Sequence, residues 1–200
     1  MTKKNKFPLF PLNQVILPGE LIPLHIFEDR YIKMVKKRLD LNEEFGIVYI
    51  KNNLIEKVGC SVAIKKVIKK YNNGKYDILC KGQKRFKINK LHKGKSRWYG
   101  DITFLDQEPK KKEREYFEKT LNKYLKFLLS INVETNFKNE LNKKEAYDFM
   151  RNILLPLEIK QRMLNLDNET ERLDFINNFI DLAAASLDSK AKNENMTELN

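Results

Sequence analysis

The sequence is poor in the residues that most often bind metal ions or act as nucleophiles. Its 200 residues include two cysteines and two histidines. Cys60 and Cys80 lie in strand-like apolar runs, where a cysteine usually serves as a small core residue of a protein in a reducing compartment. His25 and His92 are far apart in sequence and have no cysteine at ligand spacing, so no zinc pattern is present. We therefore expect no metal site and no cofactor.

Catalytic motifs are also missing. The sequence has no Gly-x-Ser-x-Gly nucleophile elbow and no His-Glu-x-x-His array. A phosphate loop is approached by NKLHKGKS, residues 89–96, which ends in Gly94-Lys95-Ser96. Asn89 stands where that loop has its first glycine, and we expect a strand to follow, so the helix N-terminus that holds a phosphate is lacking. The sequence predicts that the chain is not an enzyme.

Long apolar runs are absent as well. A transmembrane helix needs about 20 consecutive apolar residues, and no run in the chain approaches that length. The N-terminus MTKKNK is basic, but prolines interrupt the apolar residues that follow it, so no signal-peptide core forms. We therefore expect a cytoplasmic protein that does not associate with a membrane.

Positive charge is abundant and unevenly distributed. Of the formal net charge of +12, all lies in residues 1–109, which hold 23 basic and 11 acidic side chains, against 16 and 16 in residues 110–200. Residues 51–97 contain 15 basic and two acidic side chains, a pattern that can bind a polyanion. The alternative is ordinary solvated surface, which we favour here, because 31 of the 39 basic residues are lysine and arginine is the better phosphate ligand.

The sequence of the N-terminal part of the chain, residues 1–108, predicts strands and turns. Strands are expected at 20–27, 45–50, 85–89 and 97–105, and a hairpin at residues 61–82 is indicated by Asn73-Gly74. One helix is expected after Asp29, its N-cap, with Tyr31, Met34, Val35 and Leu39 on one face. Prolines confine the strands to short or edge positions: Pro8, Pro11, Pro18 and Pro23. Many short strands with one early helix predict a small, partly closed barrel.

The C-terminal part reads as helices. Residues 110–131 carry apolar side chains at helical spacing, residues 138–154 are weaker but helical, and residues 157–164 continue after Pro156. Asn168 and Glu171 are spaced like a capping box that begins a last helix. We expect an α-helical bundle at 109–187, folding as one cooperative unit with the barrel, and a polar, disordered tail at 188–200.

Three stretches of the sequence resemble one family. FPLFPLNQVILPGELIPLHIFEDRYIKMV, residues 7–35, resembles the opening signature of the Lon-protease N-terminal (substrate-binding) domain family. The resemblance continues through VGCSVAIKKVIKKYNNGKYDILCKGQKRFKI at 58–88, with Gly82 followed by Arg85-Phe86, and through LPLEIKQRMLNLDNETERLDFI at 155–176. It covers roughly residues 7–185, is close to stand-alone bacterial members, and extends to the Lon-like domain of cereblon.

The resemblance implies an α+β fold, a PUA-like β pseudo-barrel followed by an α-helical bundle. The prolines would then shape short barrel strands, and FEDRY would lead into the first helix, with Glu28 and Arg30 paired locally. A full-length Lon protease also carries an ATPase module and a Ser–Lys dyad, and the present sequence has neither a phosphate loop nor room for these modules before Asn200. Fold similarity does not transfer their activity.

Two functions from different classes remain open at this point. The first is a non-catalytic module that binds unfolded or degron-bearing polypeptides or a partner protein, with contacts expected at Phe27, Asp29, Arg30, Lys33 and Trp98. The alternative is an RNA-binding protein that uses the basic face of the barrel. Its contacts would be Lys65, Lys66, Lys69, Lys70, Lys84, Arg85 and Arg97.

Overall fold

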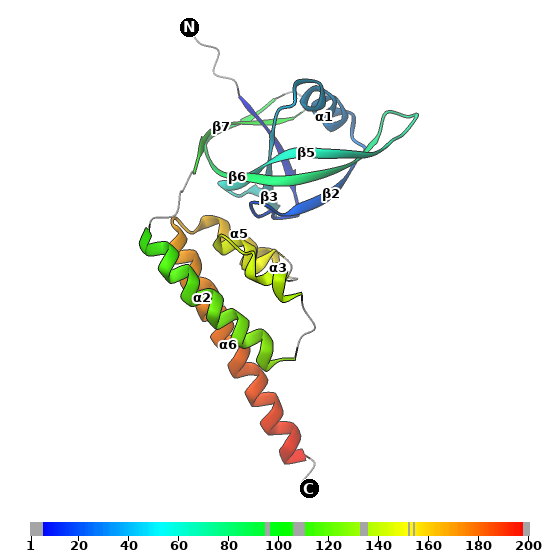
Figure 1. The fold of residues 1–200 in the computed structure, drawn as a ribbon. Coiled ribbons are helices and arrows are strands. Elements are labelled where there is room, and N and C mark those ends of the chain that lie inside the picture. The colour runs from blue at the N-terminus through cyan, green and yellow to red at the C-terminus, as the bar shows by residue number, and fades with distance from the viewer. Residues whose placement is uncertain are drawn as a thin grey trace. The chain divides into compact units, whose positions relative to one another are not determined.

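A computed structural model describes residues 6–94, 97–105, 111–132, 136–151, 153 and 155–197. The N-terminal part contains the strands and the first helix (Figure 1). Their bounds are β1 Phe7–Leu12, β2 Leu21–Ile26, α1 Asp29–Leu41, β3 Phe45–Lys51, β4 Leu54–Ile55, β5 Val58–Lys70, β6 Tyr76–Lys93 and β7 Trp98–Phe104. The helices that follow are α2 Lys111–Ser130, α3 Phe137–Leu141, α4 Ala146–Met150, α5 Leu157–Asn165 and α6 Glu169–Thr197.

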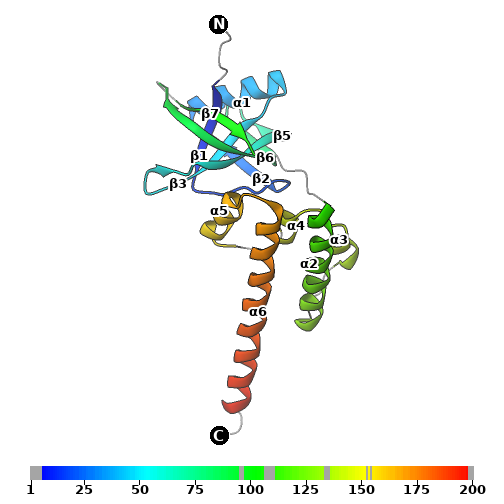
Figure 2. The same cartoon turned by 90° about the vertical axis from the view of Figure 1, so that its left-hand side faces the viewer.

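The seven strands form a sheet that closes on itself. Strand order is β1-β7-β6-β5-β3-β4, and β1 also pairs with β3, so β1 has a partner on each side. The β1–β3 pairing is parallel, whereas the other pairings are antiparallel. β2 pairs with the first half of β6. The fold class predicted from the sequence, a β pseudo-barrel followed by helices, is confirmed (Figure 2).

Three prolines of the opening stretch lie in short strands and one lies in a turn. Pro8 and Pro11 belong to β1, which is six residues long, and Pro23 lies in the middle of β2. Pro18-Gly19 forms the turn between these strands, and Gly19 has a φ of 77°, which favours glycine. The short strands expected from these prolines are therefore present.

The barrel encloses two groups of buried side chains. The larger group joins β1, β2, β3, β5 and β6 to the inner face of α1, through Tyr31, Met34 and Val35. The smaller group contains Leu9, Val48, Phe86 and Ile88. As expected, Cys60 and Cys80 are core residues with free thiols. Burial raises the pKa of the Cys80 thiol to about 12, so this thiol stays protonated at neutral pH.

Gly82 allows the loop between β1 and β2 to lie directly against β6. A Cβ atom added at Gly82 would lie 2.2 Å from the carbonyl oxygen of Leu17. The Gly19 N–H donates to the Gly82 carbonyl at 2.9 Å, and the Gly82 N–H donates to the Glu20 carbonyl at 2.9 Å. No side chain fits between these backbones, which explains the glycine in the block that resembles the Lon family.

The chain divides into two compact units, and α5 belongs to the unit of the strands. The barrel unit comprises Met1–Asp106 and Ile153–Asn165, and the helical unit comprises Gln107–Asn152 and Leu166–Asn200. The α5 residues bond to strands: the Gln161 Nε2 donates to the Val58 carbonyl at 3.0 Å. The guanidinium of Arg85, 4% exposed, donates to the Leu164 carbonyl at 2.7 Å.

In the helical unit, α2 and α6 run side by side (Figures 1 and 2). Polar side chains join them along their length. The Asn177 Nδ2 donates to the Thr120 hydroxyl at 2.9 Å, and the Lys123 ammonium lies 2.7 Å from the Asp181 carboxylate. Glu171 and Asn168 exchange hydrogen bonds at the start of α6, as the sequence indicates.

Four local features differ from the expectations. The N-cap of α1 is Glu28, and Asp29 is the first helical residue. Residues 138–154 do not form one helix, because a capping box at Glu145 and Asp148 starts α4 separately from α3. α5 groups with the strands and not with the bundle. α6 continues to Thr197, into the segment expected to be a disordered tail. The boundary expected at Glu108-Pro109 lies outside the described residues.

Candidate functional site

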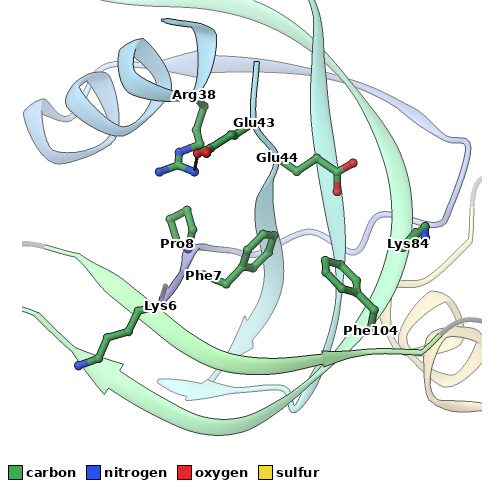
Figure 3. A pocket seen from close by; sticks show the side chains of 8 residues that line it. All are labelled: Lys6, Phe7, Pro8, Arg38, Glu43, Glu44, Lys84 and Phe104. Atoms are coloured by element: carbon green, nitrogen blue, oxygen red, sulfur yellow. Dashed lines mark hydrogen bonds and ion pairs between the residues drawn. The ribbon is translucent and has the colours of Figure 1, made fainter. Parts of the chain in front are cut away.

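A surface pocket of about 430 Å³ opens on the barrel unit. We call it the Phe7 pocket, and its volume lies in the range of small-ligand sites. Residues from four elements and one loop line it: Lys6, Phe7, Pro8, Arg38, Glu43, Glu44, Lys84 and Phe104. Figure 3 shows Arg38, Glu43 and Glu44 across from Pro8, Phe7 and Phe104, with Lys6 and Lys84 towards opposite ends.

One wall of the Phe7 pocket is aromatic. The Phe7 ring packs edge-on against Phe104 at 5.8 Å between centroids and against the buried Phe86 at 5.5 Å. Phe104 ends β7 and keeps 41% of its surface exposed, although it is a large apolar side chain. Phe86 therefore anchors a pair of rings whose outer surface is open to an apolar partner.

The facing wall is charged and is positioned by the end of α1. Asn42 adopts a left-handed conformation with φ of 50°, which ends the helix and directs the chain into Glu43 and Glu44. Arg38 from the last turn forms an ion pair with Glu43. The Arg38 Nε is buried and has no hydrogen-bond partner among the described residues.

The sequence pointed to one residue of the Phe7 pocket, Lys84. The others were missed because they come from positions 6–8, 38–44 and 104, which only the closed barrel brings together. Phe104 ends a strand and lies near a charged helix end in space, but the two are far apart in sequence. No local sequence pattern therefore indicates that they form a site. Phe7 was read within the opening stretch as a barrel residue.

The residues predicted to bind polypeptide lie on a different part of the barrel unit. Phe27 is 58% exposed and stacks on the His25 ring at 5.8 Å. Arg30 pairs with Glu28 at 2.5 Å, as expected from the FEDRY stretch, and its guanidinium lies over the Tyr31 ring. Asp29 and Lys33 are exposed on α1. Trp98 is half-buried against the smaller core group, with the Lys93 ammonium 5.5 Å from its ring.

Beside Phe27, three polar side chains form a network on the outer face of β2 and β6. The His25 Nδ1 lies 2.6 Å from the Asp77 Oδ1, and the Tyr71 hydroxyl donates to the Asp77 Oδ2 at 2.6 Å. The hydrogen bond from Tyr71 and, to a smaller extent, the one with His25 hold the pKa of the Asp77 carboxyl below its ordinary value. The same bond raises the pKa of the Tyr71 hydroxyl. Asp77 is therefore ionised and engaged at neutral pH.

The residues predicted to bind RNA fall into two groups. Lys65, Lys66, Lys69 and Lys70 are exposed on β5, and Lys84 is exposed on β6. Arg85 is buried and bonded to Leu164, so its side chain is not part of the surface. Arg97 precedes β7 and lies over the Tyr99 ring at 5.4 Å.

Two properties of the described residues bear on other kinds of site. They contain no group of three or more His, Cys, Asp or Glu side chains placed to hold a metal ion. None of their helices combines the length and apolar character that crossing a lipid bilayer requires.

Two solved structures with this fold are N-terminal domains of Lon proteins. A Lon N-terminal domain protein from Xanthomonas campestris superposes with a TM-score of 0.65 at 21% identity, covering 85% of this chain and 95% of that one. The N-terminal domain of a Mycobacterium avium complex Lon protease gives a TM-score of 0.68 at 14% identity, covering 88% and 98%. At these identities the likeness establishes the fold.

Sequence comparison establishes the family. The chain belongs to the family of the ATP-dependent protease La (LON) substrate-binding domain, whose profile matches residues 6–182. Lon protease of Buchnera aphidicola is 25% identical over 186 residues, and that of Cytophaga hutchinsonii is 24% identical over 204 residues. These alignments cover 84% and 92% of the chain but 24% and 25% of the relatives. The chain therefore spans about a quarter of their length, and the match is to the substrate-binding domain, not to ATPase or protease domains.

Proposed function

We propose that the chain is a non-catalytic, cytoplasmic polypeptide-binding module that uses the Phe7 pocket to hold an apolar side chain of an unfolded or degron-bearing polypeptide. The observation that carries the proposal is an open aromatic wall, Phe7 and Phe104, in a pocket of about 430 Å³ on a substrate-binding-domain fold. Large exposed apolar side chains in a concave site are typical of binding surfaces.

The chemistry of the pocket favours a polypeptide as its occupant. An unfolded chain offers apolar side chains on a backbone that carries carbonyl acceptors at every residue. The aromatic wall would contact such a side chain, and the Lys6 and Lys84 ammonium groups at the rim would donate to neighbouring carbonyls. Charges of both signs at the rim, from Lys6, Lys84 and Glu44, would tolerate varied flanking residues.

Affinity measurements with two matched peptides test this function. We expect a fluorescein-labelled 12-residue peptide with a central phenylalanine to bind in fluorescence anisotropy, and the same peptide with a central serine to bind weakly. Phe104→Ser should weaken the first peptide at least about tenfold, since central aromatic anchors dominate binding energy. Phe27→Ser removes a phenylalanine elsewhere on the barrel unit that is more exposed than Phe104, and it should change the affinity less than about twofold, since residues away from the hot spot contribute little.

The possible outcomes distinguish an error in the proposed function from an error in the position of the site. If Phe27→Ser abolishes binding and Phe104→Ser does not, the polypeptide site lies at Phe27, as the sequence indicated. The assignment of the site to the Phe7 pocket is then wrong. If neither peptide nor a reduced, carboxymethylated unfolded protein binds the wild-type chain, polypeptide binding itself is wrong. Circular dichroism of both variants would verify that they fold.

A further inference from the structure

A second pocket of the barrel unit, of about 610 Å³, is lined by the β3–β4 hairpin, the start of β5, one residue of β6 and the end of α5. We call it the Leu54 pocket, and its volume also lies in the range of small-ligand sites. Leu54, Ile55 and Val58 form its apolar part, and Lys51, Lys57 and Lys87 form its basic part. A site of this composition suits a ligand that carries both an apolar group and a negative charge.

The apolar part of the Leu54 pocket is accessible to a ligand. Leu54 keeps 75% of its surface exposed, more than any other large apolar side chain that the structure describes. It follows the tight turn of the β3–β4 hairpin, in which Asn52 and Asn53 have positive φ. Ile55 and Val58 beside it are half-buried. Together these side chains offer an aliphatic surface in a concave site, which is typical of ligand binding.

Two of the three lysines of the Leu54 pocket have no acidic partner among the described residues. Lys51 is engaged, because its ammonium lies 2.6 Å from the Glu158 carboxylate. This hydrogen bond raises the pKa of Lys51 and lowers the pKa of Glu158. Lys57 and Lys87 form no ion pair within the part of the chain that the structure describes. The lining contains one carboxylate, Glu56, so the pocket carries a net positive charge.

The end of α5 adds a neutral donor to the Leu54 pocket. The Asn165 side-chain oxygen accepts a hydrogen bond from the Gln161 Nε2 at 3.1 Å. Gln161 is 5% exposed, and the same nitrogen donates to the Val58 carbonyl at 3.0 Å, so the Asn165 amide is held beside the start of β5. With its oxygen engaged, Asn165 keeps an amide nitrogen that makes no hydrogen bond to a described residue. Asn165, Lys57 and Lys87 therefore supply donors to a pocket with an aliphatic part.

The C-terminus of a polypeptide matches this arrangement of groups. Its carboxylate accepts several hydrogen bonds, and charge-assisted bonds from lysine are stronger than neutral ones. Its last side chain can be aliphatic, and the N–H of its last peptide bond is a donor that Glu56 can accept. A phosphate chain matches less well, because it has neither an aliphatic group nor an N–H, and the Glu56 carboxylate repels it.

We propose that the Leu54 pocket binds the C-terminal residue of a polypeptide that ends in leucine, isoleucine or valine. The carboxylate lies against Lys57, Lys87 and Asn165, and the side chain lies against Leu54, Ile55 and Val58. The proposal rests on the polypeptide-binding function above and adds a second site to it, since the Leu54 pocket shares no lining residue with the Phe7 pocket. A polypeptide that presents a free aliphatic chain end would thus be preferred over one that does not.

Three peptides that differ only at their C-terminus test the proposal. Each is a fluorescein-labelled decapeptide of glycine and serine without an aromatic residue, so it has no anchor for the Phe7 pocket. The first ends in leucine with a free carboxylate, the second in leucine amide, and the third in serine with a free carboxylate. We expect the first to bind in fluorescence anisotropy with a Kd below about 1 mM. The other two should bind at least about tenfold more weakly, because each lacks one of the two groups that the pocket contacts.

Two pairs of variants locate the site. Lys87→Glu and Lys81→Glu change exposed lysines of the same strand and lower the formal net charge from +12 to +10, but only Lys87 lines the pocket. Lys87→Glu should weaken the free leucine peptide at least about tenfold, and Lys81→Glu less than about twofold. Leu54→Ser should weaken it at least about threefold, since an apolar contact is lost, whereas Leu21→Ser, at a leucine of β2 that is 57% exposed, should not. Circular dichroism verifies that the four variants fold.

Three results would overturn the proposal. Equal affinity for the free leucine peptide and its amide would show that the chain end is not recognised. Equal loss of affinity in Lys87→Glu and Lys81→Glu would show an effect of net charge with no site. Displacement of the peptide by octanoate or inorganic phosphate at a lower concentration than by N-acetyl-leucine would show that the pocket holds another kind of anion.

The central-phenylalanine peptide, prepared as a C-terminal amide, keeps this proposal separate from the proposed function. It should bind the wild-type chain and Lys87→Glu with the same affinity, because Lys87 does not line the Phe7 pocket. If this peptide binds and the free leucine peptide does not, the Leu54 site is wrong and the proposed function stands. If neither binds, the polypeptide-binding function and the site that rests on it are both wrong.

Discussion

Substituting Gly82 by alanine should strongly destabilise the barrel unit. The new Cβ would lie 2.2 Å from the Leu17 carbonyl oxygen, and that neighbour is backbone, so it cannot rotate away. The loop must move outward by about 1 Å to restore an ordinary contact, since a van der Waals separation is about 3.5 Å or slightly less for oxygen. Such a shift also stretches the two hydrogen bonds that Gly19 and Glu20 make with Gly82.

The expected loss for Gly82→Ala follows from these two terms. Overpacking costs about 1–3 kcal/mol. Each weakened backbone hydrogen bond adds up to about 0.5–1.5 kcal/mol. We therefore expect the free energy of unfolding to fall by about 2–6 kcal/mol, a large share of the stability of a typical domain. Urea unfolding followed by Trp98 fluorescence measures it, because Trp98 lies in β7 of the barrel unit.

Gly74→Ala is the matched control. A Cβ at Gly74 has no atom within 4 Å, but the residue has a φ of 82°. The cost there is the left-handed conformation alone, about 1–2 kcal/mol. If Gly82→Ala unfolds at the same or a higher urea concentration than Gly74→Ala, the close approach of the loop to β6 is not what the structure indicates.

Two further predictions concern the same unit. The pKa of Asp77 is below its ordinary value of 3.8, so its stabilising effect is present above that pH and is lost as the pH falls through the folded-state pKa. The difference in unfolding free energy between wild type and Asp77→Asn should therefore be visible at pH 6 and shrink as the pH falls below 3.8; an unchanged difference would contradict this. A chain truncated after residue 105 lacks α5 and the Leu164 carbonyl that Arg85 bonds, so it should unfold at lower urea in Trp98 fluorescence; an unchanged midpoint would contradict the assignment of α5 to the barrel unit.

Local sequence signals accounted for much of the fold. Apolar spacing in residues 29–41 predicted α1 with Tyr31, Met34 and Val35 buried, and Asn73-Gly74 predicted the β5–β6 hairpin, in which Gly74 has positive φ. Both signals depend on neighbours within a few residues, where spacing and turn chemistry decide the structure. The placement of α5 could not be seen this way, because its partners Val58 and Arg85 lie far away in sequence.

The candidate site was harder to predict than the fold. The residues named from the sequence were exposed charged or aromatic groups close together in the chain, such as Phe27, Arg30 and Lys33. The lining of the Phe7 pocket comes from β1, from β7 and from the end of α1, which are far apart in sequence. These residues meet only because β1 closes the barrel by pairing with both β7 and β3. For Arg85 the sequence suggested exposure where the structure shows burial. Although it lies in a basic segment, its side chain is buried and donates to the Leu164 carbonyl of α5.

The account's central claim is that the Phe7 pocket receives an apolar side chain of a polypeptide. Amide chemical-shift mapping by NMR, with isotope-labelled chain titrated with the central-phenylalanine peptide, tests this claim most directly. We expect the largest chemical-shift changes at Phe7, Arg38, Glu44, Lys84 and Phe104. These residues line one pocket although they are spread over about half of the chain. Largest shifts at His25 and Phe27, with the Phe7 pocket unaffected at saturation, would contradict it.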